Sequence, residues 1–152
     1  MNPDIPQPGA SLQAVRARRA ELRESIAALE QALAGPAPGR SEIWAERVRV
    51  VLTELSADLR LHNEIAEGSE GLHREVLTTA PRLGGAIRRL VDEHAEISRL
   101  VEELLARVSG PLDGVEDTRA LGVALLSRLA RHRQAGADMI YEAYQTDIGG
   151  ET

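Results

Sequence analysis

The sequence predicts an all-α fold, an antiparallel up-down-up-down bundle of four helices. Apolar residues recur at intervals of three and four along four long segments, stretches rich in glycine and proline separate these segments, and no stretch alternates apolar with polar residues as a strand would. The length of 152 residues suits a single domain with short tails. We expect a disordered N-terminal tail at residues 1–10, the helical bundle at residues 11–146 and a C-terminal tail at residues 147–152.

The first two helices are predicted over residues 11–33 and 41–66, with a linker at residues 35–39 that is rich in proline and glycine. Ser11 suits the N-cap of the first helix, and Arg19 is the one polar residue on its apolar stripe. The apolar face of the second helix is formed by Trp44, Val48, Val51, Leu55 and Leu59.

The second helix is expected to bulge or to be interrupted in the segment 67–71, because this segment contains two glycines. Residues 72–79 are expected to resume a helical turn or two before Pro81. A third helix is predicted from Arg82 onward. Its stripe is formed by Ile87, Leu90, His94, Ile97, Val101, Leu104 and Val108.

A fourth helix is predicted to begin at Asp117 or Thr118, after a clear break at residues 109–114. Its core-facing stripe is formed by Leu121, Leu125, Leu129, His132, Gly136 and Met139. With the three preceding helices, it completes the predicted bundle.

The composition excludes several kinds of site. No cysteine is present, which excludes disulfides, thiolate-bound zinc, iron–sulfur clusters and cysteine nucleophiles, and all 18 basic residues are arginine, which excludes a catalytic lysine. The net charge of −6 argues against a nucleic-acid partner. The sequence contains no run of 18 apolar residues, so it does not predict a membrane span. We expect a cytoplasmic protein, because the N-terminal residues lack the basic start and apolar stretch of a signal peptide. The sequence contains neither a serine-hydrolase motif nor a phosphate-binding loop, so no motif of these kinds predicts an enzyme.

Three of the four histidines fall on the apolar stripes of different helices: His62 on the second, His94 on the third and His132 on the fourth. His94 and His132 lie equally far along the chain from the ends of their shared loop, about 21 Å along each helix axis, so we expect them at one depth. A bulge at residues 67–71 would bring His62 to that depth as well. Three inward-facing imidazoles at one level predict a metal site, and imidazoles with carboxylates suit iron, manganese or zinc.

Carboxylates near these histidines are the candidate oxygen ligands. Glu67 lies where the expected bulge can turn its side chain inward. Asp138 follows the fourth-helix histidine by six residues, which on a regular helix points about 120° away from the stripe, so it can join the site only if the helix is distorted. Asp58 and Glu142 are secondary candidates.

Other polar residues are expected near the site without binding a metal. Glu93 and Glu96 flank His94 and point to the sides of the helix, either toward water or as hydrogen-bond partners of a metal-bound histidine. Arg19 is expected to extend its charged end outward to water, the alternative being an ion pair with a site carboxylate.

The order of these features resembles that of the hemerythrin-like family, also called the HHE cation-binding domain. The resemblance covers roughly residues 41–146, and its individual motifs are loose. The segments that carry it are Leu61-His-Asn-Glu-Ile-Ala-Glu-Gly68, Ala80-Pro-Arg-Leu83, Asp92-Glu-His-Ala-Glu-Ile97 and Leu129-Ala-Arg-His-Arg-Gln-Ala-Gly-Ala-Asp138.

The resemblance implies a four-helix bundle that holds non-haem iron, in the family a di-iron centre. It further implies binding or sensing of O2, NO or peroxide, or iron handling, and it does not imply turnover. This chain departs from the family pattern in its first helix, which has no histidine and carries Arg19 on its stripe. The acid expected at Ala66 is found one position later, at Glu67, and Gly136 and Ala137 stand where the last motif often has its acid.

His73 lies close to where a family histidine often precedes its proline, and it is either an alternative ligand to His62 or an exposed residue. The alternative to a metal-binding protein is a metal-free helical interaction module, whose core histidines satisfy one another. In that case the partner is a helix of another protein or a second copy of this chain, which would give a homodimer.

Overall fold

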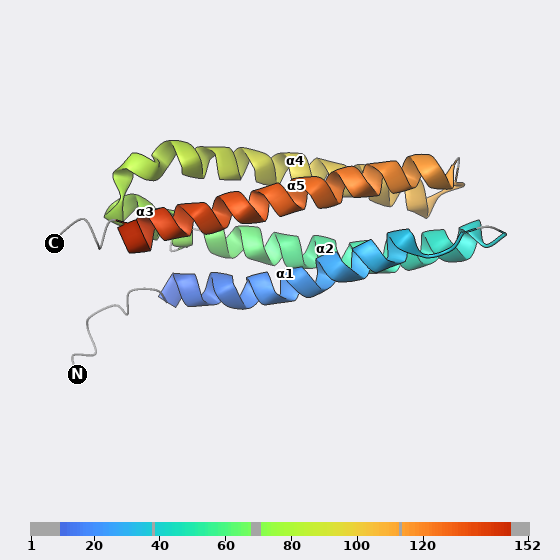
Figure 1. Cartoon of the computed structure of the whole chain (residues 1–152), viewed down its shortest axis with the longest axis horizontal. Coiled ribbons are helices and arrows are strands. Elements are labelled where there is room, and N and C mark those ends of the chain that lie inside the picture. Colours follow the sequence, from blue (N-terminus) through green and yellow to red (C-terminus); the bar gives the residue numbers. More distant parts are fainter. Residues whose placement is uncertain (1–9, 38, 68–70, 113, 147–152) are drawn as a thin grey trace.

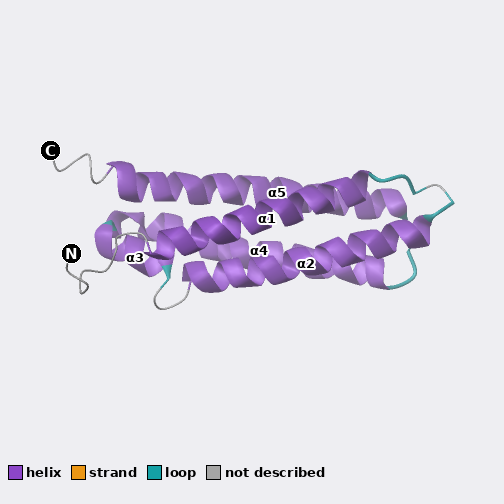
Figure 2. Ribbon diagram, turned by 90° about the horizontal axis from the view of Figure 1, so that it is seen from below, coloured by secondary structure: helices purple, strands orange, loops and turns teal. Residues whose placement is uncertain are grey.

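The computed structural model describes residues 10–37, 39–67, 71–112 and 114–146 (Figure 1). Within these ranges all regular structure is helical, so the prediction of an all-α chain with four long helices is confirmed. The long helices lie side by side in two views turned by 90° (Figures 1 and 2). They are α1 (Ala10–Ala34), α2 (Ser41–Glu67), α4 (Gly84–Ser109) and α5 (Val115–Tyr141). The shorter elements are helix α3 (Leu72–Thr79), the 3-10 turn η1 (Pro81–Leu83) and the π-helical turn η2 (Glu142–Thr146).

Three helix starts differ from the prediction. Helix α1 begins at Ala10, so Ser11 lies inside the helix instead of capping it. Pro81 opens a 3-10 turn, and α4 follows only from Gly84, because proline suits a first helical turn but lacks an N–H for the ladder. Helix α5 begins at Val115, and the Thr118 hydroxyl donates to the carbonyl of Gly114 at 2.8 Å, which places Thr118 in the first turn.

The predicted interruption after α2 falls partly on residues 68–70, which lie outside the described residues, as do the predicted tails except for residue 10. Helix α2 ends at Glu67, and Gly71 directly precedes α3. A Cβ atom at Gly71 would lie 2.8 Å from the carbonyl oxygen of Ala66, and still closer to that of Ile65. Glycine is therefore required where the chain passes back over the last turn of α2.

The apolar core has two parts. The larger cluster joins residues of α1, α2, α4 and α5, including the fully buried Leu29, Leu55, Leu104 and Leu125. The smaller cluster lies at the end of the molecule where α1 begins and α5 ends, and there α3 contributes Leu72 and Val76 (Figure 2). The site described below is lined by residues of both clusters, including Leu59 and Leu129 of the larger cluster and Leu90 and Met139 of the smaller one.

None of the described helices combines the length and the apolar character that crossing a membrane requires.

Candidate functional site

All four histidines of the sequence meet at one place, and each comes from a different helix: His62 from α2, His73 from α3, His94 from α4 and His132 from α5. We call them the four-histidine cluster. The ring centroid of His94 lies 4.4 Å from that of His132, 6.0 Å from that of His62 and 6.2 Å from that of His73. His94 is therefore the centre of the cluster, and the structure brings together the three histidines predicted to lie at one depth.

Helix packing holds these rings in the interior. His94 and His132 lie on the buried stripes of α4 and α5, and only 6% and 7% of their surface is exposed. His73 is buried to the same degree, with 7% of its surface exposed. The alternative in which His73 is an exposed residue is therefore wrong. The position of His73 depends on α3, which begins directly after Gly71. Because Gly71 has no Cβ atom, α3 can lie close to the last turn of α2.

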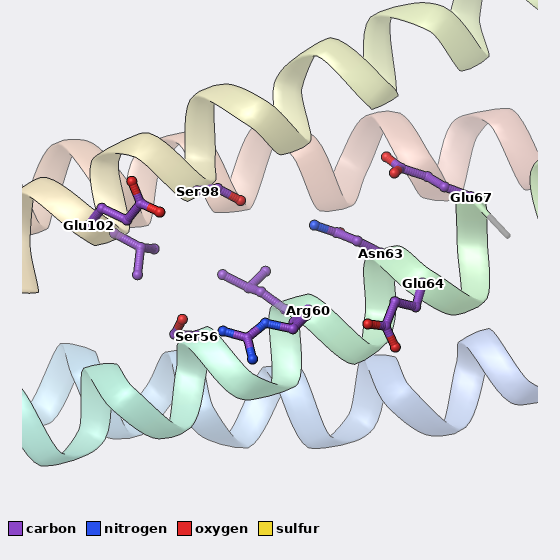
Figure 3. Close-up of a pocket in the computed structure, with 9 residues that line it drawn as sticks. Ser56, Arg60, Asn63, Glu64, Glu67, Ser98 and Glu102 are labelled. Carbon is purple, nitrogen blue, oxygen red and sulfur yellow. The ribbon is translucent and has the colours of Figure 1, made fainter.

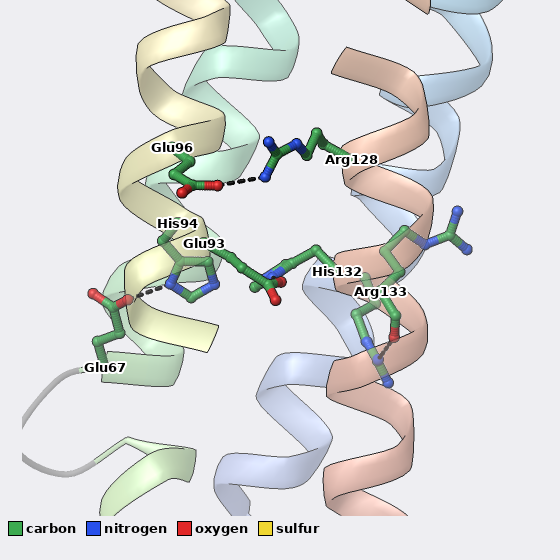
Figure 4. Close-up of polar contacts among 8 residues, drawn as sticks. Glu67, Glu93, His94, Glu96, Arg128, His132 and Arg133 are labelled. Carbon is green, nitrogen blue, oxygen red and sulfur yellow. Dashed lines mark hydrogen bonds and ion pairs between the residues drawn. The ribbon is translucent and has the colours of Figure 1, made fainter. Parts of the chain in front are cut away.

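Two carboxylates pair with two of the rings (Figure 4). Glu67 Oε1 contacts Nδ1 of His94, and Glu93 Oε2 lies 2.6 Å from Nδ1 of His132. A neutral imidazole that donates Nδ1–H to a carboxylate keeps the lone pair of Nε2 free. Metal-binding histidines commonly have this arrangement, because the carboxylate fixes the tautomer and makes the ligand nitrogen more basic.

The other two rings lack such partners. Nδ1 of His62 and Nδ1 of His73 are buried and have no hydrogen-bond partner among the described residues. A buried polar atom left without a partner costs about 1–3 kcal/mol. These two nitrogens are therefore available to bind a ligand, which would give each of them the partner that it lacks.

Burial favours the neutral form of three of the histidines, His62, His73 and His94, and the neutral form is the one that binds metals. Burial, and secondarily the nearby His94 and His132, lowers the pKa of His62 to about 4. Burial also lowers the pKa of His94 to about 3, and it lowers the pKa of His73. Burial raises the pKa of the Glu67 carboxyl, an effect that His73 and His132 oppose.

The four rings line a small, partly open cavity of about 40 Å³ between the helices. Arg19 of α1 lines it as well, and its Nη2 donates to the carbonyl oxygen of Arg133 at 3.0 Å. A Cβ atom at Gly136 would lie 3.4 Å from this Nη2, so the missing side chain of Gly136 leaves space for the guanidinium. Among the described residues Arg19 has no carboxylate partner, and its guanidinium lines the cavity because a main-chain carbonyl of α5 accepts its hydrogen bond.

A larger, open groove of about 550 Å³ lies between α2 and α4 (Figure 3). Most of its lining residues are polar, and the side chains of Asn63 and Ser98 point toward its middle. Glu67 lines one end of the groove, so the carboxylate that contacts His94 also faces this space.

Three of the predicted carboxylates lie elsewhere. Asp138 is exposed and accepts a hydrogen bond from Nε2 of Gln134 at 2.8 Å, because α5 stays α-helical through Gly136 and the distortion that Asp138 needed does not occur. Asp58 accepts a hydrogen bond from the hydroxyl of Ser25. Oε2 of Glu142 lies 3.9 Å from Nη2 of Arg82 in an exposed ion pair. None of these three carboxylates lines the cavity of the four-histidine cluster.

Glu93 was expected to point either toward water or to a metal-bound histidine, and the sequence did not indicate which histidine; in the structure it contacts His132 on a neighbouring helix. Spacing along one helix cannot reveal such a partner, since the contact depends on how α4 and α5 pack. The same packing pairs Glu96 with Arg128 nearby (Figure 4). An acidic residue that flanks a core histidine and faces the neighbouring helix is the sequence feature that could have predicted this contact.

Among the residues that the structure describes, no three histidine, aspartate or glutamate side chains are already arranged as a set of metal ligands. Binding a metal at the cluster therefore requires side-chain rotations. The buried Nδ1 atoms without partners favour such rotations, because ligation would satisfy them.

Comparisons with protein-family models, with curated proteins and with solved structures found no match to this chain.

The metal-free protein is expected to lose stability as the pH falls from about 6.5 to about 4. In this window the unfolded chain takes up protons on its histidines, whereas His62, with its pKa lowered to about 4, stays neutral in the folded state. Protonation thus favours unfolding, by on the order of 3 kcal/mol for His62 at the acid end of the window. Urea unfolding between pH 7.5 and 4 measures this. His62→Leu should weaken the dependence, and an equal pH dependence in both proteins would contradict the assignment.

Proposed function

We propose that this protein binds a transition-metal ion at the four-histidine cluster, with non-haem iron as the first candidate and zinc and manganese as alternatives. One observation carries the proposal: the four histidines of the chain, one from each of four helices, line one small cavity between the helices. Neutral imidazole nitrogens together with carboxylate oxygens are a ligand set that these metals accept. The preference for iron rests on the resemblance to the hemerythrin-like family.

The residues of the cluster fit a metal in distinct ways. His94 and His132 offer Nε2, while Glu67 and Glu93 hold their Nδ1 atoms. His62 and His73 offer nitrogens that are otherwise buried without a partner. Glu67 is also a candidate direct ligand, since its carboxylate already lies against the cluster. Asp138, Asp58 and Glu142 are not part of this proposed set.

A bound iron ion would supply a coordination position for a small ligand such as O2, NO or peroxide. The chain itself supplies the surroundings: apolar side chains of both core clusters exclude bulk water, and the carboxylates orient the rings. We infer a cytoplasmic, hemerythrin-like bundle of antiparallel up-down-up-down topology that binds or senses such a ligand or handles iron. Its ligand set differs from the family pattern, since α1 contributes Arg19 and no histidine.

Metal content of the protein purified without a histidine tag tests this function. We expect a stoichiometric metal ion, and we expect its removal by a chelator to lower the melting temperature, because a ligand that binds only the folded state stabilises it. If no metal is bound, and neither added iron nor a chelator changes melting, the metal-free interaction module is the correct description.

Glu93→Gln is expected to weaken metal binding roughly 10- to 100-fold, the usual effect of losing the partner of a ligand histidine. The reason is that Glu93 holds Nδ1 of His132. Glu96→Gln is the matched control, because Glu96 lies on the same helix but pairs with Arg128 on the surface. Competition against a chromogenic chelator measures both affinities. Equal affinities in the two variants would show that Glu93 does not support the site.

A further inference from the structure

His73 differs from the other three histidines of the cluster because it lies on a short helix. The other three belong to long helices of the bundle, whereas α3 has only eight residues. An isolated helix of this length is not stable in water, since helices shorter than about 12–15 residues are marginal by themselves. No side chain caps the start of α3. The place of the His73 ring therefore depends on what α3 packs against.

The buried face of α3 packs on the smaller core cluster. Leu72 and Val76 are 2% and 0% exposed, and they lie in this cluster with residues of α1, α4 and α5. His73 is buried on the same short helix, and its ring stacks on that of His94 with 9° between the ring planes. The hydrophobic effect is non-directional, so a directional polar contact adds a restraint on the rotation of α3 about its axis.

A hydrogen bond from the end of α5 supplies such a restraint. Tyr144 lies in the π-helical turn η2, and its hydroxyl donates to Oε1 of Glu75, two residues after His73, at 2.9 Å. The ring of Tyr144 packs against the smaller core cluster, and the hydrogen bond is partly buried. A hydroxyl that donates to a carboxylate forms one of the stronger kinds of hydrogen bond. The turn η2 thus holds α3 at a defined atom.

We propose that Tyr144 is a positioning residue of the metal site, which acts through Glu75 to hold α3 in the orientation that directs His73 to the other rings. This inference rests on the proposed metal site and adds a coupling between the end of α5 and metal affinity. Binding through His73 requires α3 to be docked, so the apparent affinity scales with the docked fraction. Because such coupling is reciprocal, a metal bound through His73 also stabilises the docked α3.

The test is a double-mutant cycle on metal affinity. Ferrous iron in oxygen-free buffer, zinc and manganese are offered separately to the untagged protein, and the tightest of the three is followed by competition against a chromogenic chelator. Tyr144→Phe removes the hydroxyl but keeps the ring in the apolar cluster. Tyr141→Phe is the matched control, because Tyr141 lies near the same end of α5 and is 62% exposed. Each is also made in a His73→Ala background.

We expect Tyr144→Phe to weaken metal binding by about 3- to 30-fold, the range for the loss of one hydrogen bond, and Tyr141→Phe to bind as the wild type does. In the His73→Ala background, Tyr144→Phe should cause no further loss. This non-additivity distinguishes positioning from a general loosening of the bundle, which would weaken binding in both backgrounds.

Amide hydrogen exchange tests the reciprocal effect. Metal should slow exchange in α3 and η2 of the wild type, and much less in His73→Ala. Equal affinity in Tyr144→Phe and the wild type, or the same loss in both backgrounds, overturns the inference and leaves the metal site intact. A His73→Ala protein with wild-type affinity does the same. A wild type that takes up none of the three metals overturns the proposed function itself.

Discussion

Replacing His94 by alanine is expected to abolish stoichiometric metal binding. His94 is the ring nearest the other three, and its Nδ1 contacts Glu67, so its loss removes one ligand and releases a carboxylate as well. The affinity should fall by more than the roughly 10- to 100-fold that losing a supporting partner costs. Elemental analysis and competition with a chelator measure the loss.

Ile97→Ala is the matched control for this variant. Ile97 lies on the same stripe of α4, is 3% exposed and does not line the cavity. Its truncation should lower the free energy of unfolding by about 2–5 kcal/mol while metal affinity is retained. A His94→Ala protein that binds metal as tightly as the wild type, or an Ile97→Ala protein that loses metal equally, would show that the ligands lie elsewhere.

Gly122→Ala is expected to destabilise the fold by about 1–3 kcal/mol, although alanine favours a helix over glycine. Gly122 is buried in α5, and a Cβ atom there would lie 2.5 Å from Cδ1 and 2.7 Å from Cδ2 of Leu33. Leu33 is itself 4% exposed and has little space to move. The melting temperature should fall by roughly 2–4 °C for each kcal/mol.

Gly85→Ala provides the opposite case. Gly85 is exposed near the start of α4, and a Cβ atom there would lie 3.9 Å from its nearest neighbour, the Arg89 side chain. The substitution should stabilise the protein by up to about 1 kcal/mol, because it reduces the freedom of the unfolded chain. If Gly122→Ala proved as stable as Gly85→Ala, α1 and α5 would not approach each other as closely as described.

The sequence was sufficient to predict the helices because their apolar stripes are long and regular. The stripe from Ile87 to Val108 is buried as expected. Along α2 the prediction was slightly wrong: Leu52 is fully buried and Val51 only partly, since a helix packed against several neighbours buries a wider face than one row of residues. Boundaries were less accurate, because they depend on local hydrogen bonds such as that of Thr118.

The candidate site could be predicted only where it depends on position along a helix. His94 and His132 could be placed at one depth from the shared loop, and their rings are adjacent. His73 could not be placed, because its position depends on how the chain turns after α2, where the periodic pattern ends. Glu93 could not be assigned either, since its partner lies on another helix. Contacts between helices require the packing itself.

X-ray absorption spectroscopy of the metal-loaded, untagged protein tests the central claim most directly, because it counts the imidazole nitrogens around the ion. The four-histidine cluster predicts three or four imidazole neighbours per metal, and one fewer in His132→Ala. A metal ion surrounded by oxygen alone, with no imidazole scattering and no change in His132→Ala, would contradict the claim that these histidines form a metal site.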